Sequence, residues 1–293
     1  MIKGISKIIF SLIFIFEKFL NFLFKRSIII YLSELIQNVS NNKLSVENKK
    51  VSFFVPNALI KWRVNTLYSK EPETIEWINE FSKRKKTIFW DIGANIGLYS
   101  IYNSIKNKNS FTIAFEPSSS NLRVLSRNIS LNKLQNKIKI FSLPLTKNLK
   151  GFMPLKERLF QEGGSMNVFG ENFNFEGKKF KSEMYYDLFG INIKFLLDNK
   201  LLDIPDYIKI DVDGIEHLIL EGAGSYLKNK KIKSISVEIN ENFKLQYLNV
   251  LKIMKKNNFI LRHKKNNLEN YASANQKFFK TYNYIFDKKN IFN

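Results

Sequence analysis

The sequence contains no cysteine, and this absence excludes disulfide bonds, thiolate metal sites and cysteine nucleophiles. Acidic residues are also few, with 26 against 47 basic ones, which gives a formal charge of +21. Such a charge ordinarily indicates a polyanionic partner. Only 7 of the basic residues are arginine, however, and the lysines are spread along the whole chain. Because arginine makes the forked contacts to phosphates and bases, we interpret the charge as a compositional bias.

The apolar start of the chain lacks an uninterrupted run long enough to cross a membrane. Its longest early uncharged run, Ile8–Phe16, would span about 14 Å as a helix, against a hydrocarbon core of about 30 Å. No small-residue cleavage site of a signal peptide is evident after it. Residues 1–37 therefore predict an amphipathic helical segment that either lies on a membrane surface or docks on protein. We expect a cytoplasmic protein, peripheral on the inner membrane face in the first case.

The rest of the chain predicts one α/β domain. Residues 38–50 are polar and predict a linker, and residues 51–293 follow as the domain. Short apolar runs alternate there with helical stretches, a pattern typical of a parallel sheet with crossover helices. The expected strands are Thr87–Asp91, Phe111–Glu116, Ile138–Leu143, Tyr207–Val212 and Ile232–Ile239. The expected helices are Glu73–Lys83, Leu98–Lys106, Ser119–Leu131, Gly214–Leu227 and Leu245–Asn257. The long segment Thr146–Lys200, between the third and fourth of these strands, is expected to cover the active site.

The stretch "FWDIGANIGLYS" predicts a nucleotide-binding corner. A strand ends in Asp91, a turn contains Gly93 and Gly97, and helical sequence follows at once. Asn95 stands where a dinucleotide enzyme needs a glycine to admit the pyrophosphate. A cofactor without phosphate, such as S-adenosylmethionine, therefore fits this loop better than NAD.

A second acid follows at the spacing that such a cofactor requires. Glu116 ends the next expected strand, 19 residues after Gly97. A carboxylate at this place can accept hydrogen bonds from both hydroxyls of a ribose. The loop and this acid together favour a nucleoside-binding site. The alternative is a turn whose glycines have only a structural role.

Several ordered motifs resemble the FkbM-type methyltransferases. They are "YSKEPETIEWI", "FWDIGANIGLYS", "AFEPSSSNLRVLSRNISLN", "DYIKIDVDGIEHLILEGA" and "SISVEIN". The resemblance implies a class I, Rossmann-like fold with a seven-stranded, mostly parallel sheet and helices on both faces. It also implies S-adenosylmethionine as the methyl donor and O-methylation, often of sugars in polyketides or surface glycans.

The resemblance further implies which residues bind the donor. Asp91, Gly93, Asn95 and Gly97 would line its methionine end, Glu116 would bind the ribose, and Asn121 would lie near that acid. The chain departs from the family where Asp213 replaces a frequent glutamate. It also departs where "MYYDLF" replaces a Leu-Asp-Asp element.

The stretch "YIKIDVDGIEH" contains the candidate catalytic residues. Lys209 is unusual because a central parallel strand is normally buried and apolar. Asp211 follows two residues later, so its side chain points to the same face of the sheet as that of Lys209. It lies at the carboxyl end of the strand, where ligands bind in open α/β sheets. Asp213 and His217 follow at helical spacing. Methyl transfer to oxygen needs a group that takes the proton of the acceptor hydroxyl. We therefore regard these four residues as candidate catalytic residues. The alternatives are a structural ion pair for the first two and a packed helix position for His217.

No metal site is predicted. Glu238 and Asn240 end the neighbouring strand and could join Asp211 around Mg²⁺, but scattered acids are a weak signal for a metal.

Three functions remain open from the sequence. The preferred one is O-methylation of a glycan or glycolipid acceptor, with residues 1–37 near a membrane. The second is a nucleic-acid methyltransferase, which the charge suggests, although the Asp/Asn-Pro-Pro-Tyr motif is absent and the strand end reads "DVDG". The third is a membrane-associated binding protein that keeps the fold without turnover. We expect no nucleic-acid partner, and the sequence does not indicate an oligomeric state.

Overall fold

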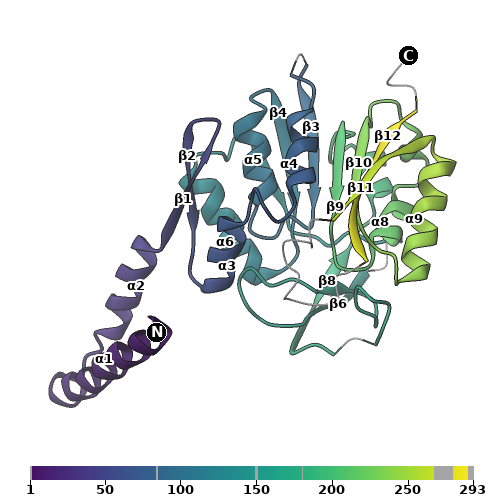
Figure 1. Cartoon of the computed structure of the whole chain (residues 1–293). Helices are drawn as coiled ribbons and strands as arrows, with labels where there is room; N and C mark the ends of the chain where they lie inside the picture. Colours follow the sequence, from purple (N-terminus) through teal and green to yellow (C-terminus); the bar gives the residue numbers. More distant parts are fainter. Residues whose placement is uncertain (1, 84, 149–150, 180, 267–279, 290–293) are drawn as a thin grey trace.

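A seven-stranded sheet forms the centre of the molecule (Figure 1). The computed structural model describes residues 2–83, 85–148, 151–179, 181–266 and 280–289. The strand order is β11-β12-β10-β9-β3-β4-β5, and β12 runs antiparallel to both of its neighbours while the other pairs are parallel. This is the strand order of the class I methyltransferase fold, so the predicted fold class is confirmed. The strands are β3 (Thr87–Ile92), β4 (Ser110–Phe115), β5 (Ile138–Phe141), β9 (Tyr207–Ile210), β10 (Ser234–Asn240), β11 (Phe259–Lys265) and β12 (Thr281–Lys288).

Helices cover both faces of this sheet because its strands are apolar on both sides. Successive residues of a strand point to opposite faces, so Phe89 and Trp90 of β3 belong to two different apolar clusters. The Phe89 cluster packs under α3 (Ala58–Asn65), α4 (Pro72–Asn79), α5 (Leu98–Lys106) and α6 (Ser119–Leu131). The Trp90 cluster packs under α7 (Ile193–Asp198), α8 (Glu216–Ala223) and α9 (Lys244–Lys256).

The five strands and five helices expected from the apolar pattern are all present. Two helices are shorter than expected. The helix expected over Glu73–Lys83 is α4 and ends at Asn79, and α8 gives way to a short 3₁₀ helix over Gly224–Lys228. The sequence pattern therefore located these elements correctly and misplaced some of their ends.

The segment 38–50 is not a linker. Most of it belongs to a β-hairpin of β1 (Asn41–Val46) and β2 (Lys49–Phe54), closed by Glu47 and Asn48 at φ 49° and 62°. Two residues at positive φ form the tight turn that antiparallel strands prefer. Val46, Val51 and Phe53 are buried in the Phe89 cluster, so the folded domain begins at this hairpin.

Helix α6 fastens the hairpin to the domain. The amide N–H of Phe54 donates to Asn128 Oδ1 over 2.8 Å, and Asn128 Nδ2 donates to the Ile96 carbonyl over 2.9 Å. One turn later, the N–H of Ser52 donates to Asn132 Oδ1 over 2.9 Å. These side chains satisfy backbone groups on the side of β2 that, among the described residues, pairs with no other strand, and Asn128 also reaches the loop after β3.

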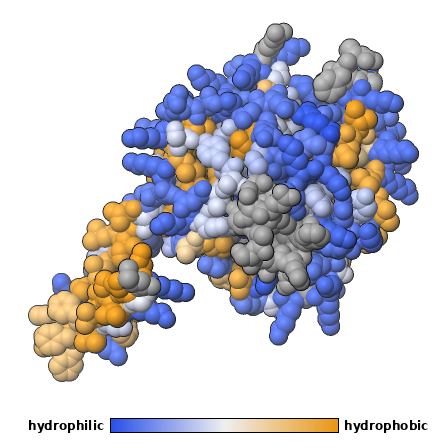
Figure 2. Space-filling view, viewed as in Figure 1, coloured by the Kyte–Doolittle hydropathy of each residue, from blue (hydrophilic) through white to orange (hydrophobic). Residues whose placement is uncertain are grey.

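The start of the chain forms two helices rather than one. Helices α1 (Ile2–Phe24) and α2 (Ile29–Val39) project from the body, and Figure 2 shows apolar residues over much of their surface. The Glu17 carboxylate is buried at their junction and accepts from the Ile28 N–H over 2.8 Å. Within the described ranges, none of the helices combines the length and apolar character that crossing a membrane requires.

The long segment after β5 forms a small antiparallel sheet. Its strands are β6 (Gly151–Glu157), β7 (Val168–Phe169) and β8 (Met184–Gly190), in the order β7-β6-β8. In Figure 1, β6 and β8 lie below the lower ends of the central strands. Leu155 of β6 and Phe169 of β7 line the main cavity of the molecule, so this segment forms part of the cavity wall.

Asn128 of α6 and Asn132, the C-cap of this helix, should differ in their effect on stability. Asn128 is fully buried, and Asn128→Ala leaves two buried backbone groups without partners, at about 1–3 kcal/mol each. Asn132→Ala removes a similar contact at a half-buried position and should cost less. Urea unfolding of both variants measures this order, and an equal loss would contradict the assigned role of Asn128.

Candidate active site

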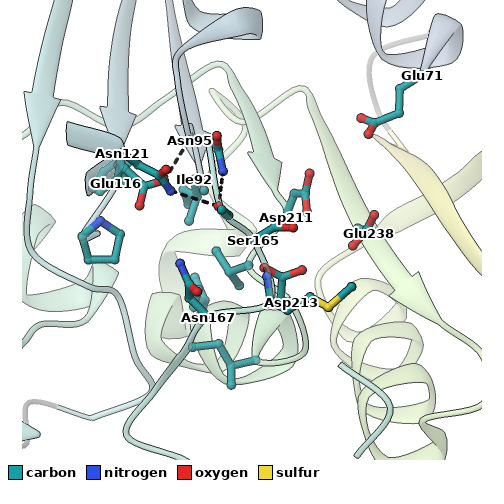
Figure 3. Close-up of a pocket in the computed structure, with 18 of the residues that line it drawn as sticks. Glu71, Ile92, Asn95, Glu116, Asn121, Ser165, Asn167, Asp211, Asp213 and Glu238 are labelled. Atoms are coloured by element: carbon teal, nitrogen blue, oxygen red, sulfur yellow. Dashed lines mark hydrogen bonds between the residues drawn. The ribbon is translucent and has the colours of Figure 1, made fainter. Parts of the chain in front are cut away.

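A cavity of about 400 Å³ opens where β3, β4, β9 and β10 end (Figure 3). Its size is typical of a small-molecule site. Figure 3 shows Glu116 and Asn121 on one side, Glu238 and Glu71 on the other, and two aspartates between them. We call the first side the Glu116 arm. The second, the acidic arm, is lined by the carboxylates of Glu71, Glu73, Asp211, Asp213 and Glu238.

The loop between β3 and α5 has the backbone that its sequence predicts. Gly93, Asn95 and Gly97 have φ of 84°, 51° and 85°, which glycine adopts freely and asparagine tolerates. A Cβ on Gly93 would lie 1.8 Å from the carbonyl oxygen of Asp211. Only glycine therefore allows the ends of β3 and β9 to approach so closely beside the cavity.

Glu116 follows β4 and is buried at the cavity wall. Its Oε2 accepts from the N–H of Asn95 over 2.7 Å, and its Oε1 accepts from the N–H of Ser118 over 2.9 Å. Burial raises the pKa of this carboxyl to about 7 despite these bonds. Each oxygen keeps a lone pair for a further donor, as two ribose hydroxyls would require.

A loop from the covering segment closes over the cavity between its two arms. Gly164, Ser165, Met166 and Asn167 line the cavity. The carbonyl of Gly164 accepts from Asn95 Nδ2 over 2.7 Å and from Asn121 Nδ2 over 3.2 Å. The N–H of Met166 donates to Asp213 Oδ2 over 2.6 Å. Three of the predicted site residues thus also hold this loop.

Arg63 of α3 fastens the same loop from its other side. Its Nε donates to the carbonyl of Gly163 over 2.7 Å, and the N–H of Gly163 donates to Asn121 Oδ1 over 2.8 Å. The sequence pattern did not predict these contacts. They join residues that are 100 positions apart for Arg63 and Gly163, and 42 positions apart for Asn121 and Gly163.

Lys209 and Asp211 form a buried ion pair at the end of β9. Lys209 is 2% exposed, and its Nζ donates to Asp211 Oδ2 over 2.7 Å. Although burial lowers the pKa of Lys209, the carboxylates of Asp211, Glu71 and Asp91 together raise it above its usual range. The lysine therefore stays charged. It also lies 5.1 Å from the centre of the Tyr99 ring, within range of a cation–π contact.

A second ion pair stands at the start of α4. Glu71 pairs with Lys70 and accepts from the hydroxyl of Tyr99 over 2.9 Å. Although burial raises its pKa, Lys70 and Lys209 hold it at about 2. The sequence pattern assigned neither residue a role, although the "YSKEPETIEWI" motif contains both Lys70 and Glu71.

The structure brings most of the predicted site residues to one place. The residues that line the main cavity are Gly93, Asn95, Glu116, Asn121, Asp211 and Asp213. Lys209 instead lines a smaller adjoining cavity of about 50 Å³.

Three predicted residues line neither cavity. Asp91 is buried behind the loop and accepts from the hydroxyl of Ser100 over 2.6 Å. Gly97 is the N-cap of α5. His217 is buried on α8, its ring 6.0 Å from that of Phe243, and its pKa is lowered by burial. Asp91 and Gly97 thus do not belong to the cavity lining that the resemblance implies for them, because both lie behind the loop surface, and the position of His217 agrees with its packed alternative.

No metal centre is formed by the residues that the structure describes. Among them, no three His, Cys, Asp or Glu side chains converge closely enough to hold an ion. Asn240 Nδ2 donates to the carbonyl of Phe175 over 3.1 Å, so this side chain is engaged in the covering segment.

The Glu116 arm fits a nucleoside with a charged amino-acid end. Asn95 Oδ1 is buried and has no hydrogen-bond partner among the described residues, and the Asn95 side chain lines the cavity, where this oxygen could accept from an ammonium group. Apolar side chains of Phe115, Leu143, Leu145 and Phe169 line the same cavity and suit an aromatic base. The residues present therefore fit S-adenosylmethionine.

Comparisons with known proteins agree with this geometry. The family model of the methyltransferase FkbM domain matches residues 91–261. The curated "Methyltransferase sdnD" of Sordaria araneosa is 26% identical over 204 residues, which are 63% of this chain and 77% of that protein.

The solved structures that resemble this chain are more distant. A precorrin-6y C5,15-methyltransferase from Geobacter metallireducens GS-15 is 14% identical with a TM-score of 0.44, over 75% of this chain and 89% of the other. TrmK of M. capricolum, in complex with S-adenosylhomocysteine, is 15% identical with a TM-score of 0.40, over 74% and 67%.

Replacing Glu116 with glutamine should weaken binding of S-adenosylhomocysteine. Hydrogen bonds to a charged acceptor contribute about 1.5–3 kcal/mol, which corresponds to roughly a 10- to 150-fold loss of affinity. Because the pKa of Glu116 lies at about 7, wild-type affinity should also rise between about pH 6 and pH 8 as the carboxyl ionises, and the variant should lack this rise. Calorimetry across this range measures both effects.

The control for this experiment is Asp198→Asn on α7, whose exposed carboxylate pairs with Lys194 away from the cavity. Its affinity and pH dependence should equal those of the wild type. Unchanged binding by the Glu116 variant would show that the ribose acceptor lies elsewhere.

Proposed function

The chain belongs to the FkbM methyltransferase family, and we propose that it transfers a methyl group from S-adenosylmethionine to a sugar hydroxyl of a surface glycan or glycolipid intermediate. The observation that carries this proposal is the acidic arm. Its carboxylates converge on a space continuous with the Glu116 arm, where the family places the donor.

The chemistry of the acidic arm favours a polyhydroxylated acceptor. Ionised carboxylates only accept hydrogen bonds, and hydroxyl groups are the donors that neutral sugars offer in number. Asn283 and Tyr282 also line this cavity, and Trp62 contributes an aromatic face of the kind that packs on apolar parts of a ligand. The arrangement supports a sugar more strongly than a compact apolar acceptor.

The same arm disfavours a phosphate-rich acceptor. Lys70 and Lys265 line the cavity, but each is paired with a glutamate, Glu71 and Glu76 respectively. A nucleic-acid backbone would meet this cluster of acidic side chains here, and like charges that come together cost several kcal/mol. Nucleic-acid methylation is therefore the less favoured function, despite the charge of +21.

The residues of the two arms have separate tasks. When bound, S-adenosylmethionine supplies a methyl group carried on a positively charged sulfur. Glu116 and Asn95 hold and orient the donor, and the loop held by Asp213 excludes water from the space between the arms. The acidic arm holds the acceptor so that one hydroxyl faces the methyl group.

Transfer of a deuterated methyl group tests this proposal. The protein, S-adenosylmethionine with a trideuterated methyl, and an envelope glycan and glycolipid extract from cells without the gene should yield sugars with a labelled methyl ether. Mass spectrometry of the hydrolysed sugars locates the label. Parallel reactions contain total RNA and genomic DNA, and label in these instead of in sugars would overturn the proposed acceptor.

We also propose that α1 and α2 attach the protein to an anionic membrane surface on the cytoplasmic side. Large apolar side chains of α1 are exposed, among them Phe10 at 60% and Phe22 at 83% (Figure 2). Five basic residues accompany them: Lys3, Lys7, Lys18, Lys25 and Arg26. Apolar and basic side chains together on a helix suit the interface of an anionic bilayer. A lipid-linked acceptor would be reached from this position.

Substitutions on α1 test the attachment in the full chain. Phe10 and Phe14 stack with ring centres 6.0 Å apart on the exposed helix, and changing both to Glu should abolish co-sedimentation with vesicles of phosphatidylcholine and phosphatidylglycerol. Phe152→Glu, at a phenylalanine of β6 that is more exposed than either of these, is the control and should still sediment. If the double variant binds vesicles like the wild type, α1 does not attach the protein.

A further inference from the structure

Glu238 is the carboxylate of the acidic arm that has no partner of its own. No hydrogen bond or ion pair joins its side chain to the residues that the structure describes, and it lines the cavity beside Asp211 and Asp213 (Figure 3). An ionisable group left without a partner in a cavity wall is costly, so its position indicates a ligand that it contacts.

The other four carboxylates of this arm are each engaged. Lys209 donates to Asp211, Lys70 and the Tyr99 hydroxyl donate to Glu71, and Asn283 Nδ2 donates to Glu73 over 2.8 Å. Asp213 accepts from the backbone of the covering loop. Each of these four carboxylates therefore has at least one oxygen in a contact, whereas both oxygens of Glu238 are without one among the described residues and can accept a proton.

The backbone holds Glu238 firmly although its side chain is unpartnered. Its strand β10 pairs with β9 on one side as far as Val237, and Glu238 itself lies opposite Asn283 of β12 on the other side. Its neighbours on β10, Val237 and Ile239, are fully buried on the other face. Glu238 itself is the half-buried residue of this strand, because its side chain enters the cavity. A base on a central strand is well positioned.

We propose that Glu238 is the catalytic base that accepts the proton of the acceptor hydroxyl. This assignment rests on the proposed O-methylation. As the acceptor oxygen forms the new C–O bond, the C–S bond breaks and its electron pair stays on sulfur. The hydroxyl proton passes to the Glu238 carboxylate, which later releases it to water. Asp211, neutralised by Lys209, then serves to position the acceptor.

The charged groups around Glu238 favour this role. Burial raises its pKa, and the nearby carboxylates of Asp211, Asp213 and Glu71 add to this shift, while Lys70 opposes it. Glu73 of α4 and Lys265 of β11 line the same cavity. A carboxyl with a raised pKa holds a proton more strongly, which makes it a better base than an ordinary glutamate.

The stability of Glu238→Gln tests the assignment without any acceptor. A carboxyl whose folded pKa is raised contributes stability at low pH that is lost as the pH rises through that pKa. The variant should therefore melt higher than the wild type at pH 8 and not at pH 5. Equal melting temperatures at pH 8 would show that Glu238 is not an unpaired carboxylate, and would overturn the proposal.

Glu241→Gln is the matched control three residues further along the chain. Glu241 pairs with Lys264 over 2.6 Å and accepts from the Tyr284 hydroxyl, and although burial raises its pKa, these partners lower it overall. A lowered pKa gives stability above the unfolded pKa that is lost as the pH falls. This variant should melt lower than the wild type at pH 8, the opposite sign to Glu238→Gln.

Turnover is measured with the trideuterated donor and the same envelope extract. Glu238→Gln should lower kcat about 10²- to 10⁴-fold, the range for loss of a general base, with unchanged affinity for S-adenosylhomocysteine. Its kcat should also lose the rise with pH that the wild type shows at saturating donor. Glu238→Asp should restore part of the rate, and Glu241→Gln should keep all of it.

The outcomes separate this inference from the proposed function. If the wild type labels sugars and Glu238→Gln labels them as fast, the base is another group and the inference is wrong while O-methylation stands. If the wild type labels no hydroxyl, O-methylation is wrong, and the assignment of Glu238 as a base falls with it whatever the melting temperatures show.

Discussion

The buried charge of Lys209 is the constraint on which the site depends. A lysine that is 2% exposed in a central strand must have a counter-ion, and Asp211 supplies it two residues later at the edge of the sheet. The backbone of Asp211 touches Gly93 of the donor loop, so the ion pair and that loop share one narrow space. With Asp211 held in this way, the acidic arm beyond it is left with one free carboxylate among the described residues, Glu238.

The sequence predicted the fold where apolar patterns are strong. The five parallel strands are short apolar runs that pack on both faces, and such runs stand out in any composition. The hairpin over 41–54 was not predicted, because Asn and Lys occupy its solvent-facing positions and give it the composition of a polar linker. Strands β11 and β12 at the far end of the sheet mix polar and apolar residues, so neither was predicted.

The site was predictable where one motif contains the residues. The loop at Gly93 and the acid at Glu116 follow from spacing, and both line the cavity. The contacts of the covering loop join segments that only the folded chain brings together, so spacing cannot show them. Spacing also does not show that Lys70 and Glu71 lie at the cavity. Helical spacing suggested His217, but α8 turns this side chain into the core.

A double-mutant cycle on Lys209 and Asp211 tests the central claim most directly. Removing one partner of a buried ion pair costs about 3–5 kcal/mol, because the other charge stays buried. Lys209→Met and Asp211→Asn should each lower the free energy of unfolding by such an amount, and the double variant should lose clearly less than the sum. Additive losses, or no loss for Asp211→Asn, would contradict the account.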